Sequence, residues 1–166
     1  MTRAPAPRRL RLVDREPMQD RIEQTYVDHA DRLWRSVRAF CGDDAVASDA
    51  VAEAFAQLLG RGEAVRDPAA WVWRAAFRIA AGDLDSRRRR GATEVVEVRA
   101  VEGPDADVLD LIRALAQLSP SQRAAVVLHD YAGFRAREAA DTVGSTEAAM
   151  RVHLMRGRRK LRLLLS

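Results

Sequence analysis

The sequence has a single cysteine, Cys41, in 166 residues. No disulfide can therefore form within the chain, and a lone cysteine without a cysteine and histidine cluster at ligand spacing makes a poor zinc site. Aromatic residues make up only 5%, and Ala, Arg and Leu recur where a sheet protein would carry Val, Ile, Thr and Tyr. These scarcities predict an all-helical protein of a reducing compartment.

Long apolar runs and catalytic motifs are also missing. No apolar stretch approaches the roughly 20 residues that span a bilayer, and the N-terminus lacks the apolar core of a signal peptide. There is no glycine-rich phosphate loop, no serine or cysteine in an interpretable motif with a histidine and an acid, and no carboxylate and histidine metal set. We therefore expect a cytoplasmic protein that is not an enzyme, does not contact a membrane, and has no cofactor or metal.

Charge is plentiful and unevenly placed. The chain has 28 Lys and Arg against 24 Asp and Glu, a net charge of +4. Six basic side chains and no acid lie between Arg151 and Arg162, and residues 87–90 form a second basic block. Two separate basic clusters indicate two contacts with a polyanion.

Helical periodicity and capping signals divide the chain into elements. The pattern predicts helices over 18–40 and 44–59, and a third that begins at Asp67 and Pro68 and reaches the arginine block. It resumes near Val108, and Ser119, Pro120 and Gln122 form a capping box for a helix that stops near Gly133. Helices over 135–143 and 147–165 follow.

Between these helical runs lie two segments with little periodic apolar content. We expect a mobile basic N-terminal arm (1–17), a helical domain (18–90), a flexible linker (91–104) and a second helical domain (105–166). A β-hairpin in the linker would have no further strand to pair with. Its acids Glu94, Glu97 and Glu102 fit a plain flexible spacer.

The last two helices match a helix-turn-helix that binds DNA. Gly144 takes the tight turn, and Thr146 caps a basic second helix so that its early residues face the major groove. Arg151 is the candidate for reading a base edge, with His153 and Arg156 on the same helix, whereas the cluster from Arg158 to Lys160 is expected to grip phosphates. The alternative is a solvated amphipathic helix that ends a bundle.

Residues 118–161 resemble, without gaps, the promoter-reading region 4 of extracytoplasmic-function sigma factors. The family's sequence runs from a Leu-Ser/Pro-x-x-x-Arg opening through a Tyr-x-Gly turn and a Glu-x-Ala helix to an Arg-x-Arg-x-x-Leu end. The matching positions are Leu118, Arg123, Tyr131, Gly133, Glu138, Ala140, Gly144, Arg156, Arg158 and Leu161. The resemblance implies recognition of the promoter −35 element by this domain.

The first half resembles region 2 of the same family. Asp49, Val51, Glu53 and Phe55 match its Asp-x-Val-x-Glu-x-Phe core, which implies that Asp49, Glu53 and Phe55 dock on the polymerase beta-prime clamp. The basic helix that follows resembles the segment that melts the −10 element. The residues expected to contact the −10 strand are Trp73, Arg74, Arg78, Arg87 and Arg88.

The two tryptophans of that helix are two residues apart and must point in different directions. Trp71 continues the apolar stripe, so we expect it to be buried. Trp73 either stacks on an unpaired base or packs against the first helix. Arg74 and Arg78, one turn apart, either track a DNA strand or form a solvated face.

The resemblance predicts a sigma factor whose partners are core RNA polymerase, through the beta-prime clamp and beta flap, promoter DNA and a possible anti-sigma factor. Departures from the family pattern at Ala52, Arg78 and Arg135 bear on core binding and on the −10 sequence. Two alternatives stay open: a stand-alone helix-turn-helix repressor, and a diverged relative that acts by binding an anti-sigma factor.

Overall fold

The computed structural model describes residues 17–91 and 106–166, and both ranges are helical without a strand. The elements of the first range are α1 (Pro17–Cys41), α2 (Asp44–Arg61), the short 3-10 turn η1 (Gly62–Ala64) and α3 (Pro68–Arg89). Those of the second are α4 (Ala106–Ala116), α5 (Pro120–Val126), the π-helical turn η2 (Val127–Tyr131), α6 (Ala136–Val143) and α7 (Glu147–Leu165). The predicted all-helical class is confirmed. The expected linker, apart from Gly91, and the expected arm, apart from Pro17, lie outside the described residues.

The helices begin where the sequence has capping side chains. Asp43 Oδ1 accepts a hydrogen bond from the Val46 N–H, and Asp67 Oδ1 accepts one from the Ala70 N–H. Ser119 accepts from the Gln122 N–H while the Gln122 side chain accepts from the Ser119 N–H, which is the predicted capping box. These local bonds satisfy N–H groups that a helix start leaves without a partner.

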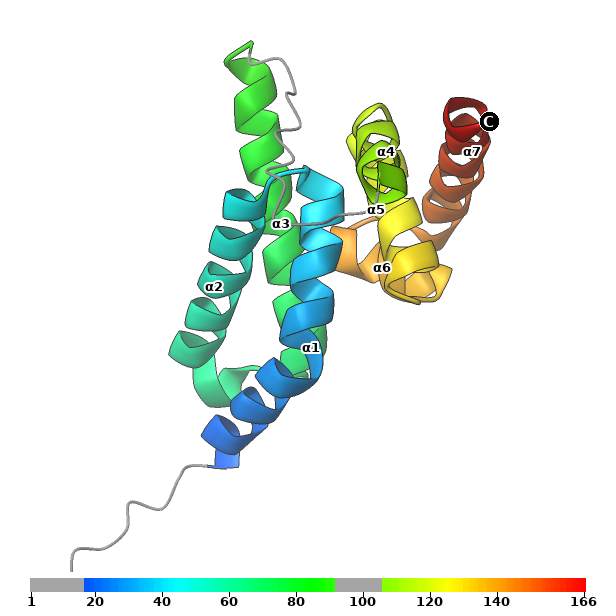
Figure 1. Cartoon of the computed structure of the whole chain (residues 1–166). Helices are drawn as coiled ribbons and strands as arrows, with labels where there is room; N and C mark the ends of the chain where they lie inside the picture. Colours follow the sequence, from blue (N-terminus) through cyan, green and yellow to red (C-terminus); the bar gives the residue numbers. More distant parts are fainter. Residues whose placement is uncertain (1–16, 92–105) are drawn as a thin grey trace, which may run out of the picture.

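In the first half, α1, α2 and α3 pack side by side as a three-helix bundle (Figure 1). Its core includes Leu33 and Phe40 of α1, Leu58 of α2, and Trp73 and Phe77 of α3. Phe40 and Phe77 lie with ring centroids 5.3 Å apart. The small residues of α2 and α3, such as Ala54 and Ala76, are fully buried, and they let these helices approach closely.

In the second half, α7 packs along α5 and then meets α6 at a tight turn. Gly144 ends α6 with φ 68°, a left-handed conformation that glycine adopts without strain. Gly157 allows the close contact between α7 and α5, because a Cβ at this position would lie 2.9 Å from Val126 Cγ2. The turn and this contact fix the direction in which α7 leaves the bundle.

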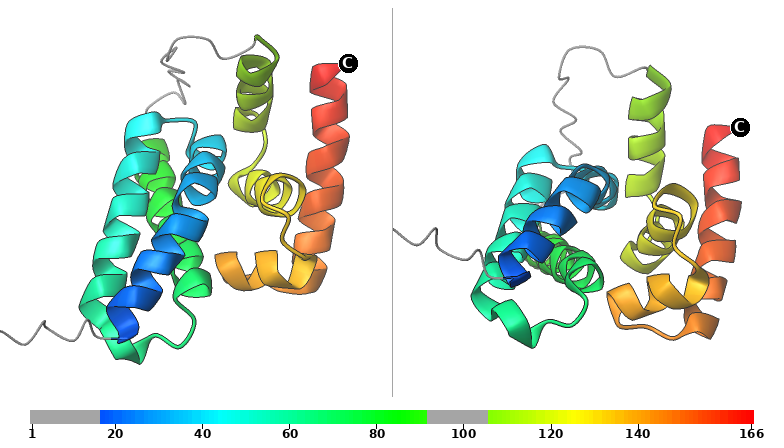
Figure 2. Two further views of the ribbon diagram at one scale, coloured as in Figure 1. Left: turned by 60° about the horizontal axis from the view of Figure 1, so that its bottom comes forward. Right: turned by 90° about the horizontal axis from the view of Figure 1, so that it is seen from below.

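The two halves lie side by side in both views of Figure 2, and their buried apolar residues form one continuous cluster. The guanidinium of Arg123, 2% exposed, donates across the boundary to the Phe40 carbonyl at 2.9 Å. It also donates to the Ala116 and Leu118 carbonyls of its own half. Trp73 of α3 and Phe134, in the turn before α6, meet with ring centroids 4.7 Å apart.

The expectation that Trp71 is buried is wrong, whereas of the two alternatives for Trp73 the structure shows packing, against α1 as well as Phe134. Trp73 is 1% exposed, whereas Trp71 is half-buried with the Arg61 guanidinium 5.7 Å from its ring centroid. Trp73 is buried because Phe134, from the other half of the chain, covers the side of α3 that the apolar periodicity of α3 alone predicts to be exposed. None of the described helices is long and apolar enough to cross a membrane.

Candidate nucleic-acid interface

The helix-turn-helix is built by α6, the turn at residues 144–146 and α7. Ala139 and Ala140 are buried on the side of α6 that faces its neighbours. Met150 and Leu154 are the buried apolar side chains of the first half of α7. Thr146 caps α7 by accepting a hydrogen bond from the Ala149 N–H. The first turns of α7 therefore have a fixed direction and an exposed outer face, as a recognition helix needs.

The candidate −35 residues do not all share one face of α7. Arg151 and Arg158 line a hollow of about 920 Å³ between the start of α6 and the outer side of α7. His153 lines a different cavity, of about 620 Å³, on the side that faces α3. Arg156 and Thr146 are exposed. The expected group is thus divided between two sides of the helix.

Arg151 is exposed but oriented by an acid on its own helix. Its Nε and Nη2 atoms donate to Glu147 Oε1 at 3.1 and 2.6 Å, one helical turn away. A pair this exposed has a small effect on stability. The pair with Glu147 nevertheless keeps the Arg151 guanidinium near the N-terminal end of α7, the end that a recognition helix presents to base edges.

Arg158 forms an ion pair with an acidic residue of η2. Its Nε donates to Asp130 Oδ2 of η2 at 2.9 Å, and Asp130 also contacts His129. The Arg158 hydrogen bond, together with His129, keeps the pKa of Asp130 below its ordinary value despite partial burial. Arg158 therefore ties α7 to η2, which differs from the phosphate contact that its place in the basic cluster suggests.

Four further arginines line the same hollow: Arg135, Arg137, Arg159 and Arg162. The last two belong to the basic cluster of α7, whereas reading α7 alone missed Arg135 and Arg137. Among the described residues, the side chains of these four arginines have no hydrogen-bond or ion-pair partner. Arg135 and Arg137 come from the start of α6, where the Arg135 N–H is capped by Glu138. The signal in the sequence was Arg135, which stands where the family often has a capping serine. The hollow is strongly cationic and faces outward.

The candidate −10 residues fall into three environments. Arg74 and Arg78 are exposed on α3 and line the 620 Å³ cavity together with His153. Trp73 is buried, so it is not placed to meet an unpaired base in this arrangement. Arg88 is exposed at the end of α3.

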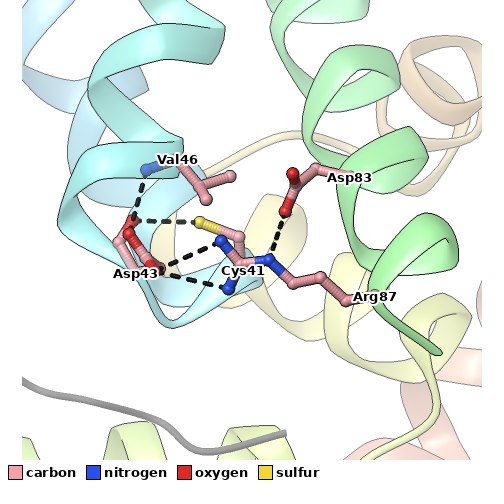
Figure 3. Close-up of polar contacts among 5 residues, drawn as sticks. All are labelled: Cys41, Asp43, Val46, Asp83 and Arg87. Atoms are coloured by element: carbon pink, nitrogen blue, oxygen red, sulfur yellow. Dashed lines mark hydrogen bonds and ion pairs between the residues drawn. The ribbon is translucent and has the colours of Figure 1, made fainter. Parts of the chain in front are cut away.

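Arg87 is engaged within its own half (Figure 3). Its guanidinium contacts Asp43 Oδ2 at 3.3 Å and Asp83 Oδ2 at 2.7 Å, which ties the end of α3 to the turn between α1 and α2. Burial acts to raise the pKa of Asp43, but the Val46 N–H and Arg87 outweigh it and lower that pKa. Burial raises the pKa of the neighbouring Cys41 thiol to about 11, so this cysteine stays protonated and packs as a small apolar residue.

The residues expected to dock on polymerase lie along α2. Asp49 and Glu53 are exposed and one turn apart, and Glu53 accepts a hydrogen bond from Gln57. Phe55 is buried and meets Tyr26 of α1 edge-on, with ring centroids 5.0 Å apart. Phe55 thus supports the α1 and α2 surface from inside, while the acids and the exposed Tyr26 form its outside.

Comparison with known sequences identifies this arrangement. A model of the family described as "Sigma-70, region 4" matches residues 109–161, which contain the helix-turn-helix. The ECF RNA polymerase sigma factor SigL of Mycobacterium tuberculosis is 31% identical over 152 residues, covering 84% of this chain and 86% of SigL. The probable ECF sigma factor SigI of the same organism is 29% identical, covering 81% of this chain and 54% of SigI.

Solved structures agree on the fold. The sigma factor RpoE, in complex with the anti-sigma factor NepR from Bartonella quintana, superimposes with a TM-score of 0.69 at 21% identity, over 88% of this chain and 97% of RpoE. CnrH, in complex with the cytosolic domain of CnrY, gives 0.66 at 23% identity, over 89% of this chain and 88% of CnrH. The fold and the sequence relatives define a two-part helical sigma factor. The chain belongs to the extracytoplasmic-function sigma factors, which regulate transcription initiation.

Proposed function

We propose that this sigma factor binds core RNA polymerase and directs it to promoters through two surfaces, one in residues 18–90 and one in residues 105–166. The observation that carries the proposal is the cationic hollow beside the capped N-terminus of α7. A helix-turn-helix with such a flank fits duplex DNA, because the helix enters the major groove while neighbouring cations meet phosphates.

On the −35 side, Arg151 and Arg156 are the base-reading candidates and Thr146 fixes the start of their helix. The arginines without an acidic partner in the described residues, Arg159 among them, are the better candidates for gripping phosphates. A cation already bonded to Asp130, as Arg158 is, would have to give up that pair first. His153 faces α3 and reaches DNA only if that side is uncovered.

On the −10 side, Arg74, Arg78 and Arg88 are the exposed cations that can follow a single strand. Asp49 and Glu53 supply the acidic face for the beta-prime clamp, and the beta flap would meet the second half. In this proposal the protein adds promoter choice to polymerase and has no catalysis of its own.

An anti-sigma factor is a further proposed partner. Both solved relatives were captured with an anti-sigma factor or the cytosolic domain of CnrY. This chain has an apolar hollow of about 450 Å³ between α1, α4 and η2, with Leu111 and Tyr131 exposed on its rim. An apolar segment of a regulatory partner would fit that surface.

Run-off transcription tests the proposal: purified core polymerase is assayed with and without the protein on the DNA upstream of its gene. An Arg151→Ala and Arg156→Ala double variant is the control for the recognition helix. Promoter-specific transcripts that vanish with the double variant are expected. If polymerase neither binds the protein nor gains specificity, while the protein alone shifts duplex DNA, a stand-alone repressor is the better account.

A further inference from the structure

The cavity of about 620 Å³ beside α3 is large enough to hold a small molecule. Its lining comes from α1 and α3 on one side and from α5, α6 and α7 on the other. Small molecules bind in protein cavities of about 300 to 1,000 Å³ that are mostly apolar and have a few well-placed polar groups. This cavity therefore has the size of a ligand site, and its lining indicates the chemistry of the ligand.

The inner part of the cavity is apolar. Phe40 of α1, Phe77 of α3 and Met150 of α7 line it, and each of these side chains is at most 2% exposed. Pro120 at the start of α5 and Val143 at the end of α6 add apolar surface that solvent reaches. A hydrocarbon chain or ring in the cavity would gain free energy by leaving water for this surface. The lining therefore favours a ligand with an apolar body.

The charged side chains of the lining favour an anion. Arg74 and Arg78 are exposed, lie one turn apart on α3, and have no hydrogen-bond or ion-pair partner among the described residues. His153 of α7 is half-buried, and its imidazole can donate a further hydrogen bond. The acid of the lining is Asp141 of α6, which two guanidiniums outweigh. Because Asp141 repels a second negative charge, a carboxylate fits better than a phosphate dianion.

We propose that this cavity binds a small amphiphilic carboxylate. Its apolar body lies against Phe77 and Met150, and its carboxylate accepts hydrogen bonds from Arg74 and Arg78. Planar guanidiniums suit this role because they bind carboxylates through paired, charge-assisted hydrogen bonds. The inference goes beyond the proposed function, and its test needs neither polymerase nor promoter. The same two guanidiniums are the proposed −10 contacts, so a bound carboxylate competes with a DNA strand for them.

Methionine methyl groups report on binding at this cavity in the full chain. Met150 lines the cavity, whereas Met155 is exposed and lines the cationic hollow beside α7, and Met18 lies in the core of the first half. The methyl groups are labelled with ¹³C, and Met150→Leu and Met155→Leu, which nearly conserve volume, assign their resonances. The probe is decanoate, added below its micelle concentration. We expect a saturable shift of the Met150 resonance, with those of Met155 and Met18 unchanged.

A double variant, Arg74→Gln with Arg78→Gln, tests the charged part of the site. Both side chains are exposed, so we expect the variant to fold. It should weaken decanoate binding about tenfold, because two charge-assisted hydrogen bonds are lost at a partly solvated position. Arg66→Gln with Arg90→Gln is the matched control. It removes the same two charges from exposed positions outside the cavity and should leave the dissociation constant unchanged.

Any of four results overturns the proposal. The Met150 resonance stays in place throughout the titration, or the Met155 resonance shifts in its stead because decanoate has bound the cationic hollow. Decyltrimethylammonium, which has the same chain and the opposite charge, shifts Met150 as decanoate does. The Arg74→Gln and Arg78→Gln variant binds decanoate as tightly as wild type. None of these results depends on polymerase, so failure of the ligand site and failure of the proposed function are distinguishable.

Discussion

At the scale of single residues, neighbouring arginines differ in what surrounds them. Arg158 is bonded to Asp130, whereas Arg159 has no side-chain partner among the described residues, although both line the same hollow. Arg87 is tied to Asp43 and Asp83, and Arg88 is exposed. A run of like charges in a sequence therefore mixes side chains that hold the fold with others that are free to meet a polyanion.

This difference predicts that substitutions of two adjacent arginines affect different quantities, DNA binding in one case and stability in the other. Arg159→Ala should leave the melting temperature unchanged and reduce the slope of log affinity against log salt by about 0.9, the loss of one phosphate contact. Arg158→Ala should lower stability by less than about 1 kcal/mol, because its pair with Asp130 is partly solvated. Thermal unfolding and salt-dependent binding to a −35 duplex check both. Equal losses of affinity without a change in stability would contradict the assignment.

His29 makes the burial of Trp73 sensitive to pH. Burial and then Arg32 lower the pKa of His29, with Asp28 and Asp67 acting the other way. Because the folded pKa lies below the unfolded value of 6.5, the unfolded chain binds the proton first. This contribution to stability is complete above pH 6.5 and is lost as the pH falls from 6.5 through the folded pKa. The charged groups that share the adjoining cavity are Arg32, Asp67, Arg74, Glu138 and Asp141.

The expected result is that wild type loses more thermal stability than His29→Gln between pH 7.5 and 5.5. A glutamine carbonyl accepts the indole N–H at either pH, whereas a protonated histidine does not accept. Unfolding followed by circular dichroism at several pH values measures the difference. Parallel pH profiles for the two proteins would show that protonation of His29 does not affect the stability of the fold.

At the scale of elements, the starts and bounds of helices could be predicted from nearby residues, whereas contacts between the two halves of the chain could not. The start of α5 at Ser119 and the bounds of α7 followed from capping residues and periodicity, because a cap acts within three or four residues. The burial of Trp73 and the bridging role of Arg123 depend on partners in the opposite half of the chain. The side of α7 on which His153 lies faces α3, a neighbour that the local sequence of α7 does not specify.

The contact of α7 with α5 gives a sharp prediction at this scale. Gly157→Ala should destabilise the protein by about 1–3 kcal/mol, since its Cβ would lie 2.9 Å from Val126 Cγ2 and 3.2 Å from the Gln122 carbonyl oxygen. Gly82→Ala, inside α3 with nothing within 4 Å of its Cβ, should stabilise it by about 0.5–1 kcal/mol. Denaturant unfolding measures both. Stabilisation by Gly157→Ala would contradict the close packing described.

At the scale of the whole molecule, the family resemblance predicted the helical two-part fold, but the sequence alone did not predict how the parts meet. The expectation of two domains on a flexible linker leaves their surfaces independent. The structure instead joins them through Arg123 and through Trp73 with Phe134, in one continuous apolar core.

We propose above that this chain gives polymerase a choice of promoter through two surfaces. The most direct test is transcription by core polymerase from a pool of DNA templates with randomised upstream sequence, followed by sequencing of the templates that yield transcripts. The account predicts two enriched elements at a fixed spacing, and weakened selection of the upstream element with the Arg151→Ala and Arg156→Ala variant. Transcripts without any enriched element, at the level given by core polymerase alone, would contradict it.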